Sequence, residues 1–251
     1  MADELRTGVG DVAITVAPFT TDGDLALDPS QLEDHPELER AMRDAGFELA
    51  RQEGGHIDPG KWVAWTSADG KDIEVPIDLI VPDAVAGPGS RAARLGVHGK
   101  EAARRAVGLE AALIDHSEIT ITALEPGDDR SIVTNVAGVA ALLVAKLHKV
   151  HDRVASGKDH RQDDKDAADV IRIMQTTSPE ELGATLRELA RDDVAGPVAS
   201  AAVDYLRELF GRRGAVGVQM AARALEFGMP AERVEALALA YADTLLTAIG
   251  R

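Results

Sequence analysis

The chain has 251 residues and a formal net charge of −16, and its residues are 45% hydrophobic, 28% charged and only 3% aromatic. This composition is typical of a globular protein of one large or two modest domains, with a core built from Ala, Val, Leu and Ile. The absence of cysteine excludes disulfides, thiolate metal sites and cysteine nucleophiles. Because we find neither a leader sequence nor an apolar run of about 20 residues, we expect a cytoplasmic protein with no membrane partner.

The first 136 residues predict a mixed α/β region. Alternating or apolar runs bounded by Gly, Pro and Asp predict strands, and a run that starts on proline and stops at Gly46 predicts a short helix. The expected strands cover 9–16, 21–28, 47–51, 62–66, 72–81, 119–124 and 131–136, and the expected helix covers 36–45.

Two carboxylates stand two residues apart in the stretch Thr20–Leu27. Because a strand alternates its side chains between faces, Asp22 and Asp24 project on one side and the leucines on the other. Paired carboxylates in a partly buried strand are costly unless a positive group lies between them, and a divalent cation takes oxygen ligands. The alternative is a polar turn that enters a strand, since Asp-Gly is common in turns.

The clearest strand of the chain is Asp72–Val81, which alternates between two faces. One face is apolar throughout, at positions 73, 75, 77, 79 and 81. Asp78 lies on the other face and is a third carboxylate in a mostly apolar strand. Pro76 predicts an edge position or a bulge, because proline cannot donate to a sheet ladder.

The most basic region of this acidic chain carries five cations, Arg91, Arg94, Lys100, Arg104 and Arg105. A net charge of −16 repels nucleic acid in general, so a polyanionic substrate needs a local basic patch or a metal ion. The region is therefore either a solvated face or a patch that admits nucleotide or RNA against the global charge.

From Ala137 onward the pattern is helical, so we expect an α/β domain over 1–136 and a helical domain over 137–251. The first helix has an apolar stripe at positions 139, 142, 143, 147, 150 and 154, and Lys146 lies inside it. Lys146 is either a long-stemmed residue at the rim of the core or a cation aimed at an interior anion. Further helices are expected from Lys165, from the capping box Ser178-Pro179-Glu180-Glu181, and over 198–210, 216–227 and 231–249.

Three carboxylates thus stand on two strands, namely Asp22, Asp24 and Asp78. Metal-assisted phosphoryl transfer uses such a cluster, because carboxylates hold metal ions that bridge phosphate oxygens and neutralise developing charge. One carboxylate can also orient or deprotonate an attacking hydroxyl. A lysine such as Lys146 suits a triphosphate as a point charge.

Four motifs resemble the nucleotidyltransferase superfamily (DNA polymerase β-like). Thr21-Asp22-Gly23-Asp24-Leu25 is similar to its Thr-x-Asp-x-Asp-Leu signature, and Val75-Pro76-Ile77-Asp78-Leu79-Ile80-Val81 is similar to its third-carboxylate strand. The segment Ala140–Leu147 and the run Lys165-Asp166-Ala167-Ala168-Asp169 resemble the lysine and Lys-Asp-x-x-Asp elements of the AbiEii/MenT-like branch. That branch includes toxins of toxin–antitoxin systems. The resemblance covers residues 10–175.

The resemblance implies an α+β fold, in which a nucleotidyltransferase-like mixed sheet with flanking helices is followed by an all-helical C-terminal domain. It implies Mg²⁺ as cofactor and a nucleoside triphosphate (NTP) as substrate. The nucleoside monophosphate would move to a hydroxyl acceptor on tRNA or on a protein. A toxin of this kind would also have a cognate antitoxin as partner.

The family's roles carry over to matching positions of this chain. The resemblance implies that Asp22 and Asp24 bind Mg²⁺ with the nucleotide, and that Asp78 completes the metal site or serves as base. Thr21 and Lys146 would bind the nucleotide, with Lys146 meeting the phosphates. The second half would support the site through Asp166 or Asp169.

One departure from the family concerns the region before the Asp-x-Asp strand. The family has a strand, a Gly-Gly or Gly-Ser turn and a short helix there, and the turn helps to hold the triphosphate, whereas Met1-Ala2-Asp3-Glu4 contains no glycine. We therefore expect either a start later than the natural one or loss of the phosphate cradle. Two alternatives follow: a catalytically degenerate or truncated binding or regulatory protein of this fold, and an antibiotic-type nucleotidyltransferase that acts on a small molecule.

For the remaining candidates we expect structural or solvent-exposed positions without a functional role. His148 and His151 stand at i and i+3 on a helix without an evident third metal ligand, and we expect them on a solvated flank. Trp62 and Trp65 are expected to be packing residues. Asp163-Asp164 is expected to be N-terminal helix charge that the helix dipole favours.

Overall fold

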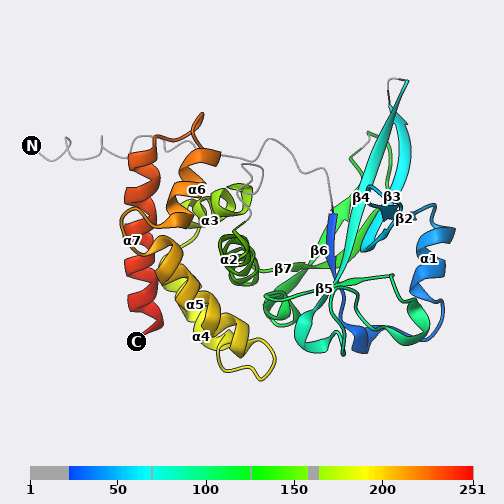
Figure 1. Cartoon of the computed structure of the whole chain (residues 1–251), viewed down its shortest axis with the longest axis horizontal. Helices are drawn as coiled ribbons and strands as arrows, with labels where there is room; N and C mark the ends of the chain where they lie inside the picture. The colour runs from blue at the N-terminus through cyan, green and yellow to red at the C-terminus, as the bar shows by residue number, and fades with distance from the viewer. Residues whose placement is uncertain (1–22, 69, 125, 158–163, 251) are drawn as a thin grey trace, which may run out of the picture.

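The computed structural model describes residues 23–68, 70–124, 126–157 and 164–250 and shows an α+β protein. In Figure 1 the strands β1–β5 lie with α1 on one side, and helices α2–α7 gather on the other. The predicted strand over 9–16, and Thr21 and Asp22, lie outside the described residues. None of the described helices is both long and apolar enough to cross a membrane.

A five-stranded mixed sheet makes up the first part of the fold. Its strands are β1 (Gly23–Ala26), β2 (Glu48–Arg51), β3 (Ile57–Ala68), β4 (Lys71–Pro82) and β5 (Arg104–Ala106). Their order is β1-β4-β3-β2, and β5 also pairs with β4. Strands β1 and β5 run parallel to β4, whereas β3 runs antiparallel to it. The strands predicted within 21–81 are therefore confirmed, with β3 beginning earlier than expected.

Strand β4 is an inner strand of the sheet, but within the described residues Pro76 itself is flanked by β3 alone. β3 pairs with β4 as far as Asp78, and β5 pairs with it from Ile80 onward. The pairing with β1 covers Ile77–Ile80, and so begins just after Pro76. Proline is tolerated there because no described residue of β1 needs a ladder hydrogen bond from position 76.

Gly60 lies where β3 gives way to β5 beside β4. Its φ is +75°, and its amide donates to the Glu101 carbonyl over 2.8 Å. A Cβ at this position would lie 2.5 Å from the Leu79 carbonyl oxygen and closer still to the Arg104 nitrogen. The close approach of these backbones therefore requires glycine, and it brings the start of β5 against β4.

The sheet has its own buried core, centred on Trp62. This side chain is fully buried, and its Nε1 donates to the Ala102 carbonyl over 2.8 Å. Helix α1 (Leu38–Asp44) flanks the same core through Leu38 and Met42. Trp65 was also expected to pack, but it is 68% exposed, so that prediction is wrong. The reason is that β3 and β4 extend as a hairpin beyond the core, as Figure 1 shows.

A second, two-stranded sheet connects the two parts of the fold. Strands β6 (His116–Thr122) and β7 (Ser131–Ala137) pair antiparallel, which confirms the predicted strand pair. Just before them, the buried Glu110 accepts from two backbone amides, Ala84 over 3.1 Å and Gly108 over 2.8 Å. Glu110 thus links the end of the β4 region to the short 3-10 helix η4 (Glu110–Leu113), which packs on α2.

The second half of the chain is helical, as predicted. Its helices are α2 (Val139–Ser156), α3 (Lys165–Thr176), α4 (Pro179–Leu189), α5 (Gly196–Phe210), α6 (Val216–Ala224) and α7 (Ala231–Ile249). We call α2–α7 the helical unit and β1–β5 with α1 the sheet unit. The helical unit has a buried core separate from that of the sheet unit.

The buried face of α2 differs from the predicted stripe. Leu143 and Leu147 are buried as expected, but Val139 and Leu142 are 40% and 42% exposed. The buried face also includes positions 140, 141, 144 and 148. The face is wider because α2 packs against α3, α5 and η4 together, so small alanines take part in close helix contacts.

The predicted N-terminal cap of α4 is confirmed, and its contribution to stability can be measured. The Ser178 hydroxyl accepts from the Glu181 amide over 3.3 Å. We expect Ser178→Ala to lower the free energy of unfolding by about 1 kcal/mol, because one orphan amide of the first turn loses its partner. Urea unfolding followed by circular dichroism at 222 nm measures this. Thr185→Ala in the same helix is the control and should leave stability unchanged or slightly raised. Equal effects of the two changes would contradict a capping role.

Candidate functional site

The sheet brings two of the predicted carboxylates side by side. Asp24 on β1 and Asp78 on β4 are Cα partners in parallel strands, and Lys61 on β3 is the Cα partner of Asp78 on its other flank. Cα partners project from the same face, and neighbouring strands lie about 4.8 Å apart. Asp24, Asp78 and Lys61 therefore form one row across the sheet, which we call the carboxylate row. Asp22, the third predicted ligand, lies outside the described residues.

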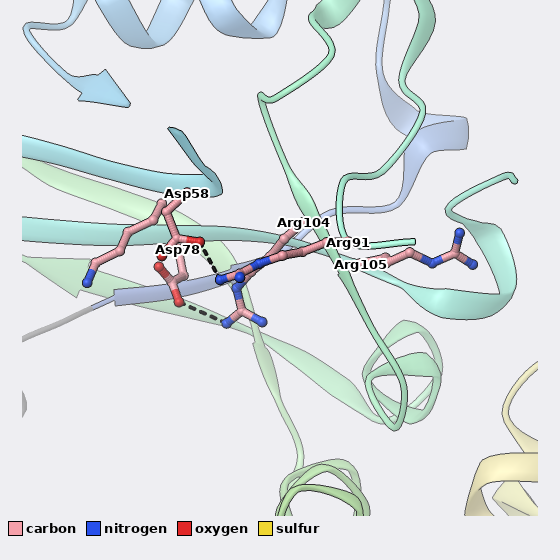
Figure 2. A pocket seen from close by; sticks show the side chains of 6 residues that line it. Asp58, Asp78, Arg91, Arg104 and Arg105 are labelled. Atoms are coloured by element: carbon pink, nitrogen blue, oxygen red, sulfur yellow. Dashed lines mark hydrogen bonds and ion pairs between the residues drawn. The ribbon is translucent and has the colours of Figure 1, made fainter. Parts of the chain in front are cut away.

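A pocket of about 300 Å³ lies at this row. Its lining side chains are Asp58, Lys61, Asp78, Arg91, Arg104 and Arg105. Figure 2 shows the two ion pairs that cross it: Arg104 Nη2 donates to Asp78 Oδ2 over 2.8 Å, and Arg91 pairs with Asp58. Asp78 and Arg104 are both part-buried, with side chains 21% and 28% exposed. The pocket thus combines four cationic groups with two carboxylates in a protein whose net charge is −16.

Arg104 reaches Asp78 because of strand register. Arg104 is the Cα partner of Ile80, two residues along β4 from Asp78 and therefore on the same face. Its neighbour Arg105 projects from the opposite face of β5. In Figure 2 the Arg105 guanidinium points away from the two ion pairs.

Arg105 has a structural role at the edge of the pocket. Its Nε donates to Asp83 Oδ1 over 2.6 Å, and its Nη1 donates to the carbonyls of Gly87 and Gly89 over 2.8 Å each. These bonds hold the loop that carries Arg91. The basic region 91–105 is therefore neither wholly a solvated face nor wholly a patch: Arg91 and Arg104 line the pocket, and Arg105 shapes it.

Lys146 lies in a different cluster, between α2 and α3. Its Nζ is 2.7 Å from Asp166 Oδ1 and 2.7 Å from Asp169 Oδ2. Asp166 is fully buried and also pairs with Lys149, over 3.5 Å, and with Arg153. The resemblance implied that Lys146, Asp166 and Asp169 join Asp78 in one nucleotide site. The structure brings these three residues together, but none of them lines the pocket at Asp78.

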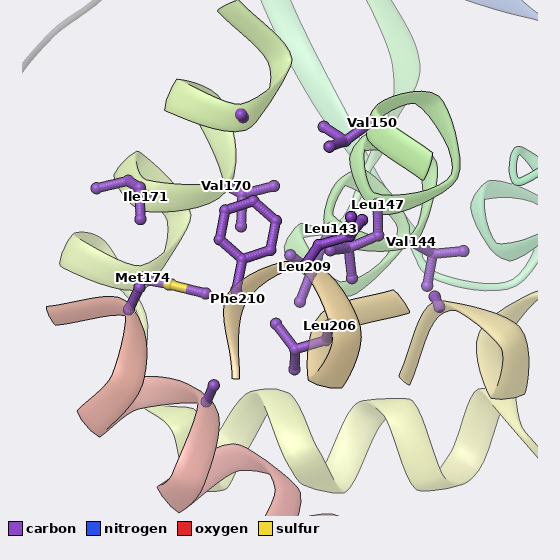
Figure 3. Packing of buried hydrophobic residues seen from close by; sticks show 14 of the residues in the cluster. Leu143, Val144, Leu147, Val150, Val170, Ile171, Met174, Leu206, Leu209 and Phe210 are labelled. Carbon is purple, nitrogen blue, oxygen red and sulfur yellow. The ribbon is translucent and has the colours of Figure 1, made fainter. Parts of the chain in front are cut away.

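The packing of α2 on α3 explains this cluster. Figure 3 shows Leu143 and Leu147 of α2 in the same core as Val170 and Met174 of α3. That contact places Lys146, at the flank of the buried face, opposite the first turn of α3. The rim position and the interior anion, offered as alternatives for Lys146, are thus combined, since its side chain is 25% exposed and its partner Asp166 is buried.

The charges of this cluster shift each other's ionisation. Burial by itself raises the Asp166 pKa, but the nearby cations, above all Lys149 and Lys146, outweigh burial and hold that pKa below its ordinary value. Burial lowers the Lys146 pKa, but attraction to Asp166 and Asp169 outweighs it and raises that pKa. Both groups are therefore charged at neutral pH.

Comparison with known proteins adds no relative. No protein-family model, curated protein or solved structure matches this chain.

The two histidines of α2 contact α5 through Val198 and Tyr205. His148 is buried, its Nε2 donates to the Val198 carbonyl over 2.9 Å, and its ring meets the Tyr205 ring edge-on. His151 stacks on the same Tyr205 ring, nearly parallel to it, with ring centroids 3.8 Å apart. The solvated flank expected for His148 is wrong, because this face of α2 packs on α5.

Two residues of the pocket were missed by sequence reasoning. Asp58 lies in a stretch that looked like a Gly/Pro/Asp-rich loop, although it belongs to β3. Lys61 stands just before the predicted strand 62–66 and carries no motif. Extending the predicted strand back by one residue would have placed Lys61 on the face opposite Trp62.

Proposed function

We propose that the carboxylate row and its pocket form the nucleotide site of a Mg²⁺-dependent nucleotidyltransferase. The protein would move a nucleoside monophosphate from an NTP to a hydroxyl acceptor and release pyrophosphate. The observation that carries the proposal is the register of β1 and β4, which makes Asp24 and Asp78 neighbours beside a cationic pocket.

The carboxylates fit Mg²⁺ that is bound together with a nucleotide. Mg²⁺ is usually held by one or two carboxylates, waters and substrate phosphates, and does not need a cage of protein ligands. Within the described residues no group of three His, Cys, Asp or Glu side chains could hold a metal ion. Asp24 and Asp78, with Asp22 as the predicted third ligand, would hold Mg²⁺, which when bound neutralises charge on the phosphates.

The cations fit the phosphates. Arginine binds phosphate through two parallel hydrogen bonds, and lysine binds it as a point charge. Arg91, Arg104 and Lys61 supply both kinds of group within one pocket. This assignment gives the phosphate contacts to the sheet unit, and the contact of Lys146 with phosphates stays a prediction of the resemblance.

For the acceptor, the support is the family resemblance alone. tRNA or a protein would supply the hydroxyl, and a toxin of this kind would be restrained by a cognate antitoxin. The alternative acceptor is a small cationic molecule of the antibiotic type, which the net charge of −16 would attract.

A second candidate function has one observation in its favour. Asp78 Oδ2 already accepts from Arg104, so this carboxylate has a partner without a metal ion. A binding or regulatory protein that takes nucleotide phosphates and performs no transfer would keep such an ion pair.

Incubation with each NTP labelled at the α-phosphate tests the proposal. We expect label transfer to total tRNA or to a protein in the presence of Mg²⁺, with pyrophosphate released. The double variant Asp24→Asn/Asp78→Asn should lower the rate at least about a hundredfold, because the metal loses its carboxylates.

Asp72→Asn is the matched control, since Asp72 lies on β4 outside the pocket and pairs with Ser67 of β3. It should leave the transfer unchanged. Binding of NTP without transfer to any acceptor, antibiotics included, would favour the regulatory function. If no NTP binds, the nucleotide site itself is refuted.

A further inference from the structure

Arg104 touches both halves of the proposed site. Its guanidinium donates to Asp78 over 2.8 Å, and the same side chain lines the pocket assigned to phosphates. Figure 2 shows its ion pair with Asp78 beside the ion pair of Arg91 with Asp58. Arg104 therefore stands where a divalent cation and a polyphosphate would each require a change in its contacts.

Two competitions follow from this position. A divalent cation competes with the Arg104 guanidinium for the Asp78 carboxylate, and the two positive charges repel each other. A polyphosphate competes with Asp78 for the guanidinium, because phosphate oxygens accept two parallel hydrogen bonds from arginine. Since the Asp78–Arg104 pair is only part-buried, the guanidinium can exchange partners without leaving a fully buried charge unpaired.

We propose that Arg104 couples anion and metal binding at this site. Before an anion binds, Arg104 holds Asp78 and opposes a divalent cation. A polyphosphate then draws the guanidinium from Asp78, and the released carboxylate becomes available to the cation. This inference rests on the proposed function, and it makes Arg104 a positioning residue that favours binding of the metal together with the nucleotide.

Arg91 supplies a matched comparison. It is a pocket arginine with its own carboxylate partner, Asp58. Asp58 lines the same pocket but is not part of the carboxylate row, so exchange at Arg91 releases Asp58 and leaves the Asp78–Arg104 pair in place. The two arginines therefore have similar relations to a phosphate and different relations to Asp78.

Separate binding measurements on the full chain test the coupling. Mn²⁺ binding without anion is followed by electron paramagnetic resonance of the free ion, and binding of inorganic tripolyphosphate is followed by calorimetry in the presence of EDTA. We expect Arg104→Met to weaken tripolyphosphate binding about tenfold, the order of one charge-assisted hydrogen bond. The same change should tighten Mn²⁺ binding about fivefold, because Asp78 loses its competing partner.

Arg91→Met should weaken tripolyphosphate binding by a similar factor and change Mn²⁺ binding less than about twofold. Arg104→Lys, which keeps the charge but not the paired donors, should show an intermediate gain for Mn²⁺, and it serves if Arg104→Met fails to fold. Opposite effects of one substitution on the two ligands, seen at Arg104 and not at Arg91, support the coupling.

Equal Mn²⁺ gains in the Arg104 and Arg91 variants would overturn the coupling and leave the proposed function standing. A wild-type chain that binds neither Mn²⁺ nor tripolyphosphate, and no NTP with Mg²⁺, would overturn both.

Discussion

Replacing Asp166 with asparagine is expected to lower the free energy of unfolding of the helical unit by roughly 2–4 kcal/mol. Asparagine keeps the volume of the side chain, so the loss comes from charge. Asp166 is fully buried among Lys146, Lys149 and Arg153, and without its carboxylate these cations repel one another across the α2–α3 contact. The expected loss is smaller than for breaking a fully buried ion pair, because the three cationic side chains are partly exposed to water.

Urea unfolding at 222 nm measures this change, and Asp169→Asn is the matched control. Asp169 also pairs with Lys146, over 2.7 Å, but its side chain is 29% exposed. The control should therefore cost no more than about 1 kcal/mol. Equal losses of stability in the two variants would contradict the claim that burial makes the Asp166 charge the more important one.

The same comparison has a defined pH dependence. The Asp166 pKa is lowered in the folded protein, so the unfolded chain takes up this proton first as pH falls. Its stabilisation is fully present above the ordinary pKa of about 4 and is lost as pH falls through the lower folded value. The difference between wild type and Asp166→Asn should stay constant from pH 7 to about 5 and shrink below about pH 4.

Gly60→Ala is expected to destabilise the sheet unit by about 3 kcal/mol or more. Two costs add at this position, since an alanine must adopt φ near +75° and its Cβ would overlap the Leu79 carbonyl and the Arg104 nitrogen. The sheet can relieve the overlap only by separating β5 from β4. That movement would carry Arg104 away from Asp78, so tripolyphosphate binding should weaken as well.

The two tryptophans give a local readout of this change. Both of them, Trp62 and Trp65, lie in β3, so tryptophan fluorescence reports unfolding of the sheet unit. Gly70→Ala is the control, because Gly70 has nearly the same φ, +72°, with nothing within 4 Å of its Cβ position. The control should show the backbone cost alone, about 1 kcal/mol. A fluorescence transition equal to that of wild type in Gly60→Ala would refute the close-approach argument.

Part of the candidate site could be found from the sequence. Asp24 and Asp78 were marked by apolar alternation around a carboxylate, which is a local signal. The run Lys165-Asp166-Ala167-Ala168-Asp169 and the lysine in an apolar helical stripe were local signals as well. Asp58 and Lys61 carried no such signal, because their importance comes only from the neighbours that the sheet gives them.

The sequence by itself determined the order and kind of the longer elements within the described residues, including the α/β start, the β6–β7 pair, the helical second half and the cap at Ser178, but it did not predict the short strand β5 that carries Arg104. Alternation, 3–4 spacing and capping are local patterns, so a short window of residues carries them. It did not determine that Asp24 would lie beside Asp78, that Arg104 would bind Asp78 across 26 positions, or that Asp166 would hold Lys146. These contacts depend on strand order, register and helix packing, which the whole chain sets when its apolar faces are buried together.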